Sequence, residues 1–262
     1  MVKNKLMPVL FVGHGSPMNA IEDNEFSRKW ENLGKTIPRP KAIVCISAHW
    51  ETKGTSVTSM NKPKTIHDFG GFPEELYEIV YPALGSKSLA QEIKDSVKSE
   101  IKLDESWGLD HGTWSVLRKM YPLADIPVIQ LSIDFNKSIK EHYELAKQLS
   151  FLREKGVLII GSGNLVHNLM LVEFHEDFNE DFGFDWAIEA NEIFKKLINK
   201  NDYNSLINFK SLGKSVQLAI PTTEHYIPMI YSLALKKEDE SISFFNDKAV
   251  AGSLTMTSFI IS

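Results

Sequence analysis

Residues 157–167 read VLIIGSGNLVH, an apolar run that passes through two glycines and reaches a histidine. A short run of branched apolar residues is typical of a strand buried on both faces of a parallel sheet. We therefore predict a strand over 157–161. Other runs of the same character predict further buried strands, at 9–13, 42–48 and 127–133.

Helices are predicted between these strands, because apolar residues recur there at intervals of three and four. The predicted helices cover 86–100, 138–154 and 186–199. Strands that alternate with helices indicate an α/β fold with a mostly parallel central sheet flanked by helices.

Two late apolar segments, 241–245 and 254–261, are expected to add antiparallel strands to this sheet. The chain contains neither a low-complexity linker nor an internal repeat. We therefore expect one catalytic domain over residues 1–262.

The composition is that of an ordinary globular protein and excludes several other classes. Hydrophobic residues make up 43% of the 262 residues, so the chain is neither disordered nor collagen-like. The single cysteine, Cys45, rules out an internal disulfide, and its place within a predicted strand indicates an inert, buried thiol. A formal charge of −5 argues against nucleic acid as a partner.

The N-terminal apolar stretch, 6–12, is short and is followed by His and Gly, which is unlike a signal peptide. Apolar runs elsewhere are also shorter than the roughly 18 residues that a membrane helix needs. We therefore expect a cytoplasmic protein that does not bind membranes.

Four of the eight histidines follow apolar segments or glycine-rich turns: His14, His49, His167 and His225. In open α/β sheets the carboxyl ends of the strands line the crevice where ligands bind. Neutral imidazole is the commonest metal ligand in proteins. The pattern thus favours a metal site at the C-terminal edge of the strands, although four unrelated loop histidines would show the same pattern.

The other histidines have different surroundings. His111, in WGLDHGTW, either faces an aromatic pocket or is hydrogen-bonded in a turn. His67 lies in a turn-rich loop that leads into a helix. We expect His142, inside a predicted helix, and His175, in an acidic segment, to be exposed to solvent.

Six ordered blocks together resemble one known family, the class III extradiol ring-cleavage dioxygenases of the 4,5-DOPA type, over nearly the whole chain. The blocks are GHGSPMNA (13–20), SAHWET (47–52), HDFGGFPEELYEIVYPA (67–83), GLDHGTWSVL (108–117), GSGNLVHNL (161–169) and PTTEHYIP (221–228). This resemblance implies an extradiol-dioxygenase-like catalytic domain with a non-haem metal site.

The resemblance also implies a role for each of these histidines. His14, His49 and His225 correspond to metal ligands, and His167 corresponds to a further ligand or to the catalytic acid and base. His111 corresponds to a histidine that either supports a metal ligand from behind or faces the substrate, and as a catalytic residue it could hydrogen-bond the oxygen reactant. One divalent metal ion per chain is implied, Fe(II) for turnover, with Zn(II) expected in isolated protein.

The third ligand has two candidates. The wider superfamily holds iron with two histidines and one glutamate. The adjacent Glu224 and His225 both occur at this point of the chain, and their side chains point differently. We favour His225 as the ligand.

The implied reaction opens the ring of a DOPA-like catechol with O₂ and gives a muconic-semialdehyde product. Trp50, Trp107 and Phe72 are expected to form aromatic walls around the substrate. A monomer or a small homo-oligomer is expected. Two alternatives remain open, a zinc-dependent hydrolase on a related scaffold and a non-catalytic metal-binding protein.

Overall fold

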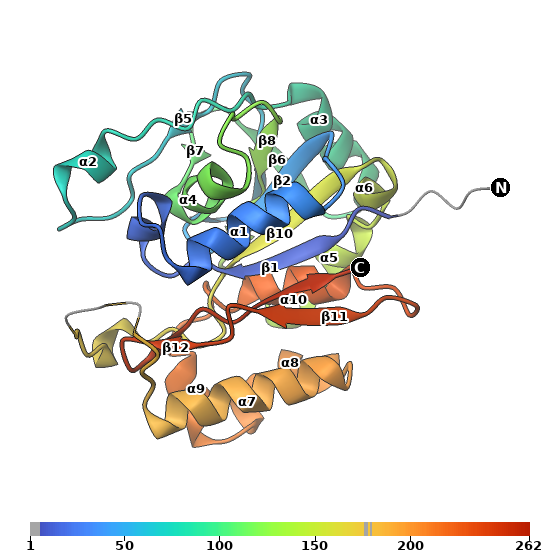
Figure 1. Ribbon diagram of the computed structural model, residues 1–262. Helices are drawn as coiled ribbons and strands as arrows, with labels where there is room; N and C mark the ends of the chain where they lie inside the picture. The colour runs from blue at the N-terminus through green and yellow to red at the C-terminus, as the bar shows by residue number, and fades with distance from the viewer. Residues whose placement is uncertain (1–5, 176–177, 179) are drawn as a thin grey trace.

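A six-stranded sheet forms the centre of the computed structural model, which describes residues 6–175, 178 and 180–262 (Figure 1). Four neighbouring strands are parallel. At one end of the sheet two further strands are added through antiparallel pairings. The strands, in spatial order, are β11 (Ile242–Phe245), β14 (Ser258–Ile261), β1 (Val9–Gly13), β10 (Val157–Gly163), β2 (Ala42–Ser47) and β8 (Val128–Gln130). The predicted α/β class, the mostly parallel sheet and the late antiparallel strands are confirmed.

The side chains of each central strand alternate between two hydrophobic cores. In β1, Val9 and Phe11 enter one core, whereas Leu10 and Val12 enter the other. Because both faces are covered, both sets of side chains must be apolar, which explains the continuous apolar runs in the sequence.

Helices cover both faces of the sheet (Figure 1). On one face lie α3 (Lys87–Ser96), α5 (Ile139–Gln148) and α10 (Ile227–Ala234). On the other face lie α1 (Glu25–Thr36) and α4 (His111–Met120). A further layer, at the bottom of the view in Figure 1, is made of α7 (Asp185–Asn199), α8 (Tyr203–Ile207) and α9 (Lys214–Ala219).

Short elements complete the described chain. They are η1 (Pro17–Ala20), β3 (Glu51–Thr52), β4 (Thr55–Thr58), β5 (Lys64–Thr65), α2 (Glu74–Tyr77), β6 (Ile101–Asp104), β7 (Gly108–Leu109), β9 (Ile133–Asp134), α6 (Phe151–Glu154), η2 (Leu169–Leu171), η3 (Phe209–Ser211), β12 (Ala249–Val250) and β13 (Leu254–Thr255).

Several predicted elements are interrupted in the structure. The 127–133 strand divides into β8 and β9, because the backbone N–H of Ser132 donates to the carbonyl of Ser56 rather than to β2. The predicted helix 138–154 breaks between α5 and α6, and the predicted strand 254–261 divides into β13 and β14. The apolar stretch before His225 belongs to helix α9 and is not a strand.

The prediction that His142 is exposed is wrong. Its side chain is fully buried, with Nδ1 3.1 Å from the Tyr231 hydroxyl and Nε2 3.2 Å from the Asp134 carbonyl. The sequence did contain an indication of this burial. His142 lies on the same helical stripe as Leu145, Ala146 and Leu149, which are also buried.

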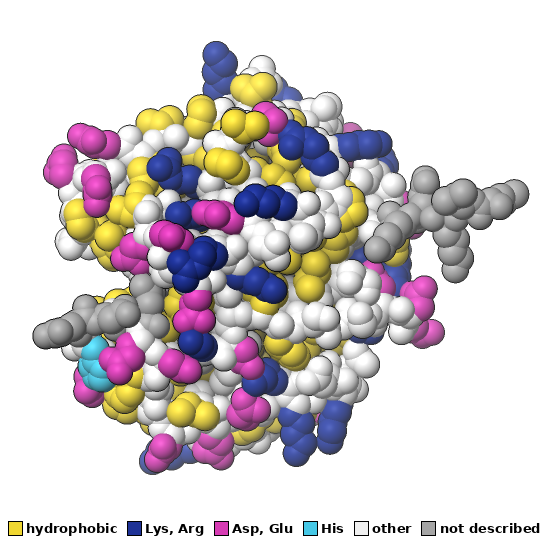
Figure 2. Space-filling view, in the orientation of Figure 1, with side chains coloured by type: hydrophobic (Ala, Val, Ile, Leu, Met, Phe, Trp, Pro, Cys, Tyr) yellow, Lys and Arg dark blue, Asp and Glu magenta, His cyan; other side chains and the backbone are white. Residues whose placement is uncertain are grey.

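On the face shown in Figure 2, basic and acidic side chains are interspersed. Every helix in the described part of the chain is too short or too polar to cross a lipid bilayer.

Candidate metal centre and substrate pocket

Three of the predicted site histidines follow adjacent strands of the sheet. His14 comes directly after β1, His49 shortly after β2, and His167 shortly after β10. The three strands are parallel, and β10 lies between the other two. Their carboxyl ends therefore meet at one edge of the sheet, where the sequence predicted the site.

His225 reaches the same edge from the loop before α10, through a close approach to the end of β10. The backbone N–H of Asn164 donates to the carbonyl of His225 at 3.0 Å. A Cβ atom on Gly163 would lie only 2.2 Å from this carbonyl oxygen. Glycine is therefore required at 163 for the two segments to meet.

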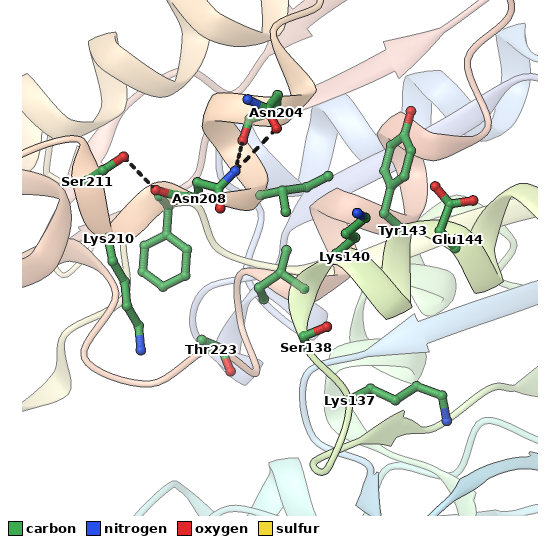
Figure 3. Close-up of a pocket in the computed structure, with 13 residues that line it drawn as sticks. Lys137, Ser138, Lys140, Tyr143, Glu144, Asn204, Asn208, Lys210, Ser211 and Thr223 are labelled. Atoms are coloured by element: carbon green, nitrogen blue, oxygen red, sulfur yellow. Dashed lines mark hydrogen bonds between the residues drawn. The ribbon is translucent and has the colours of Figure 1, made fainter.

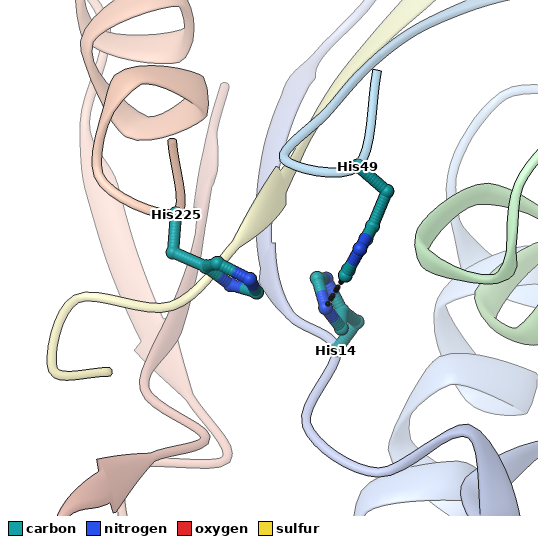
Figure 4. A group of neighbouring side chains, drawn as sticks. All are labelled: His14, His49 and His225. Atoms are coloured by element: carbon teal, nitrogen blue, oxygen red, sulfur yellow. Dashed lines mark hydrogen bonds between the residues drawn. The ribbon is translucent and has the colours of Figure 1, made fainter. Parts of the chain in front are cut away.

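The rings of His14, His49 and His225 point toward one another (Figure 4). Their centroids are 5.0 Å apart for His14 and His49, and 5.1 Å apart for each of the other two pairs. The Nε2 atoms of His14 and His49 are separated by 3.0 Å. One ligand atom from each of the three residues lies within 4.8 Å of the others, a spacing that can hold a metal ion.

The Nδ1 atom of each ring has an oxygen neighbour on the side away from the cluster. For His14 this neighbour is the Ser162 hydroxyl at 2.9 Å, and for His225 it is the Asn164 side-chain oxygen at 3.2 Å. For His49 it is a carboxylate oxygen of Asp68 at 3.3 Å. A proton on each Nδ1 satisfies these oxygens and leaves each Nε2 as a free nitrogen donor.

Two of these tautomers are determined by further hydrogen bonds. The Ser162 hydroxyl donates its proton to the Gly112 carbonyl, so it can only accept from His14. The side-chain N–H of Asn164 donates to the Thr255 carbonyl, which turns its oxygen toward His225. Two unprotonated Nε2 atoms at the 3.0 Å separation of His14 and His49 would repel, so the cluster fits a cation between them.

Burial keeps the clustered imidazoles neutral. It lowers the pKa values of His14 and His225 well below the usual 6.5, and the neighbouring histidines add to the effect. Burial and the adjacent His111 lower the pKa of His49 to about 3, although the Asp68 carboxylate opposes them. Neutral imidazole is the form that binds a metal.

Asp68 connects His49 to His111. One carboxylate oxygen lies 3.0 Å from His111 Nδ1, and the other lies 3.3 Å from His49 Nδ1. Burial acts to raise the pKa of Asp68, but hydrogen bonding and charge interactions with His111, together with His49, outweigh it and lower the pKa. The ionised carboxylate therefore orients both rings. Asp68 was not predicted from the sequence, although it stands in the HDFGG block.

His167 lies beside the three-histidine cluster. Its ring stacks on that of His225 with centroids 3.4 Å apart and planes inclined by 9°. Burial, together with the charge of His111, lowers the pKa of His167 to about 4. A ring nitrogen of His167 lies within 4.8 Å of a ring nitrogen of His225, so its position beside the cluster is compatible with both roles that the resemblance implies, a further ligand or the catalytic acid and base.

A cavity of about 460 Å³ opens onto these imidazoles. His14, His49, His111, His167 and His225 all line it. Most of its remaining wall is apolar, from Pro17, Met18, Phe69, Phe72, Leu169, Val172, Phe174, Phe178 and Leu254. Its size is in the range of about 300–1,000 Å³ that is typical of sites for small organic ligands.

The predicted aromatic walls are partly corrected by the structure. Phe72 lines the cavity as expected. Trp50 and Trp107 are not among the lining residues and stack on each other, with ring centroids 5.7 Å apart. The two rings thus pack against each other and not against the cavity, and β3, which follows Trp50, pairs with β9.

The side chains of Glu224 and His225 lie in different surroundings, as expected for adjacent residues whose side chains point differently. His225 is buried in the cluster, whereas Glu224 is partly exposed and accepts a hydrogen bond from the Thr222 hydroxyl at 2.8 Å. A carboxylate oxygen of Glu224 does lie within 4.8 Å of ligand atoms of His167 and His225. Among the described residues, however, Glu224 does not lie within that distance of His14 and His49 together. Neither His67 nor His175 lines the cavity, although the His67 ring packs edge-on against Phe69 of its wall, and His175 is exposed as predicted.

Fold and site together define an α/β enzyme with a histidine-rich centre under an aromatic-walled cavity. Residues 8–219 match the family model for the catalytic LigB subunit of aromatic ring-opening dioxygenases, and the chain belongs to this family. It is therefore an aromatic ring-opening oxidoreductase, and the family resemblance seen in the sequence is confirmed.

Individual relatives agree with this assignment. The chain is 46% identical to a 4,5-DOPA dioxygenase extradiol of Escherichia coli (strain K12), over 96% of this chain and 93% of the relative. It is 33% identical to a 4,5-DOPA dioxygenase extradiol of Beta vulgaris, over 98% and 97% of the two chains. The crystal structure of an uncharacterized protein from Escherichia coli K12 superposes with a TM-score of 0.85 at 42% identity, covering 98% of this chain and all of that one.

Proposed function

We propose that this protein opens the ring of a DOPA-like catechol with O₂ by extradiol cleavage, giving a muconic semialdehyde. The observation that carries the proposal is the cluster of His14, His49 and His225, whose free nitrogens converge beneath the aromatic-walled cavity. The relatives named as DOPA dioxygenases support the choice of a catechol with a side chain.

His14, His49 and His225 would hold one divalent metal ion. Their neutral nitrogens and the remaining open positions suit ferrous iron, which in this role binds a catechol and activates O₂. The same nitrogens suit zinc, which has no accessible redox change. We therefore expect protein isolated with zinc to bind catechols without opening their rings.

His167 would act as the acid and base. It is neutral at pH 7 because burial lowers its pKa to about 4, so it can accept a proton from a catechol hydroxyl. A low pKa also makes its protonated form a ready donor, which suits the return of the proton during ring opening. His167 lines the cavity, within reach of a substrate held over the cluster.

His111 would hydrogen-bond the oxygen reactant. Asp68 holds its ring in place, with the Asp68 carboxylate also accepting from the His111 backbone N–H at 2.9 Å. The apolar wall around these groups excludes water, which strengthens the polar interactions inside the cavity.

The test is reconstitution of metal-free protein with Fe(II) under anaerobic conditions, followed by addition of aerated catechols. Oxygen uptake with a yellow product is expected, and the zinc-loaded protein is the matched control. Hydrolysis of amide or ester substrates by the zinc form, without oxygen uptake by the iron form, would show a hydrolase instead. Tight metal binding with neither activity would show a non-catalytic metal protein.

A further inference from the structure

Residues 169–174, which contribute to the wall of the cavity over the histidines, expose four large hydrophobic side chains. These are the side chains of Leu169, Met170, Leu171 and Phe174. Leu169 is 64% exposed and Phe174 is 77% exposed, yet both also line the cavity. An exposed apolar surface of this kind is typical of a binding site, and here it is continuous with the wall of a cavity.

We refer to Leu169, Val172 and Phe174, the three residues of this segment that line the cavity, as the apolar rim. The rim begins close to the reacting end of the cavity. Leu169 follows His167 by two residues, a length of chain that spans at most about 7 Å. A ligand beside His167 is therefore within a short distance of the first rim residue.

Hydrogen bonds hold the backbone of this segment in place. The side-chain oxygen of Asn168, a buried residue, accepts from the backbone N–H of Met170 at 3.2 Å. The carbonyl of Asn168 accepts from the Ser253 hydroxyl at 2.8 Å. The backbone N–H of Glu173 donates to the carbonyl of Ala251 at 3.1 Å. The exposed apolar side chains thus extend from an anchored backbone.

The orientation of a catechol in the cavity follows from its chemistry. Its two hydroxyl groups are the atoms that would face the histidines, because they are the polar groups that react there. Ring positions 4 and 5 lie on the opposite edge of the ring and so point away from the histidines. A substituent at position 4 would therefore extend toward the exposed side of the cavity, where Leu169 and Phe174 lie.

We propose that the apolar rim binds an apolar substituent at ring position 4, so that the protein prefers catechols with longer alkyl chains to catechols with short ones. The inference rests on the proposed function, because it takes a catechol as the substrate. Each methylene group that leaves water for the rim contributes favourable transfer free energy. Because the rim is open to solvent on one side, we expect a gain of about two- to fourfold in kcat/KM per methylene.

A second cavity has a largely polar wall. It has a volume of about 740 Å³ and lies between the start of α5 and the α8–η3 segment (Figure 3). Lys137, Lys140 and Lys210 line it, together with amide side chains such as those of Asn204 and Asn208. Charged and amide groups lose hydration when an alkyl chain covers them, so this cavity is less suited to an apolar substituent.

The test uses uncharged 4-alkylcatechols, from 4-ethylcatechol to 4-pentylcatechol, with the iron-loaded protein. Beyond the ethyl group, added methylenes leave the electronic character of the ring nearly unchanged, so the series measures contacts of the chain. We expect kcat/KM to rise by about two- to fourfold with each added methylene. A flat or falling series would overturn the inference.

The rim is tested directly by the double variant Leu169→Ala/Phe174→Ala, which should lower the gain to less than about 1.5-fold per methylene. The matched control is Met170→Ala/Leu171→Ala. It removes two large exposed side chains from the same segment, and neither of them lines the cavity. This control should keep the gain of the unmodified protein. An unchanged gain in the rim variant, or an equal loss in both variants, would overturn the assignment.

A second copy of the chain is the competing occupant of the rim. If such a contact covers the rim, the alkyl series should show no gain, and sedimentation should detect a dimer that the double variant Leu169→Ala/Phe174→Ala dissociates. That result would overturn the inference.

Failure of the proposed function can be told apart from failure of this inference. If none of these catechols is opened, the reaction assignment fails, and the rim is tested by binding alone. Calorimetry then compares 4-ethylphenol with 4-pentylphenol, which cannot be cleaved as catechols. Tighter binding of 4-pentylphenol with a more negative heat-capacity change, lost in the rim variant, supports the inference. Equal binding of the two phenols overturns it.

Discussion

Nδ1 of His14 lies 2.9 Å from the hydroxyl oxygen of Ser162, whose own proton is donated to the Gly112 carbonyl. Since Ser162 can only accept from His14, the imidazole must carry its proton on Nδ1 and present Nε2 to the cluster. A serine inside strand β10 thus determines which nitrogen of His14 is available to a metal.

Replacement of this serine should weaken metal binding. In Ser162→Ala the His14 ring loses its acceptor, so we expect the affinity for Fe(II) or Zn(II) to fall by about 10- to 100-fold. Metal affinity is measured by competition with a chromophoric chelator.

The matched control for Ser162→Ala is Ser232→Ala. Ser232 is a buried serine on α10 whose hydroxyl donates to the Leu10 carbonyl, away from the cluster. This control should lose some stability and keep its metal affinity. Equal affinities in the two variants would contradict the tautomer argument.

His49 and His111 should separate metal binding from catalysis. His49→Ala removes a nitrogen from the cluster and should lose metal and activity together. His111→Ala should retain metal but react about 10²- to 10⁴-fold more slowly, because it removes a group that hydrogen-bonds a reactant. Metal content per chain and single-turnover rates check both variants. Equal metal loss in the two variants would mean that His111 is a ligand.

The identity of the third ligand can be decided by a second pair of variants. His225→Ala should lose much of its metal, because His225 is buried in the cluster with Nδ1 bonded to Asn164. Glu224→Gln should keep near-normal metal, because its carboxylate is partly exposed and bonded to Thr222. Metal content is compared after identical reconstitution. The reverse result would indicate a site of two histidines and one carboxylate.

Buried His142 should make the protein less stable in mild acid. Burial lowers its pKa to about 4, whereas the unfolded chain binds a proton near pH 6.5. Between these values the unfolded state holds more protons than the native state, so the free energy of unfolding falls as pH drops. His142 should account for about 1–2 kcal/mol of the loss between pH 7 and pH 5.

His142→Gln should reduce that pH dependence, as measured by urea unfolding at the two pH values. His175→Gln is the control, because His175 is exposed and its pKa is raised by hydrogen bonds to Glu180 and Glu173. A raised pKa stabilises the fold at low pH, so this control cannot reduce the acid-induced loss. An unchanged slope in His142→Gln would contradict the prediction.

Much of the fold and part of the site followed from local sequence patterns. The apolar run 157–161 predicted a strand buried on both faces, and β10 is such a strand. Because the carboxyl ends of parallel strands share an edge, the apolar runs and the histidines that follow them were enough to place His14, His49 and His167 together.

The remaining features depend on segments that meet only in the folded chain. His225 follows a helix rather than a strand, and it reaches the cluster because Gly163 leaves room for its backbone. Asp68 orients His49 and His111 from a loop distant in sequence from both. Sequence periodicity determined which side chains of each element are buried. Only tertiary packing decided which buried groups touch. Those contacts join elements whose separation along the chain does not indicate their distance in space.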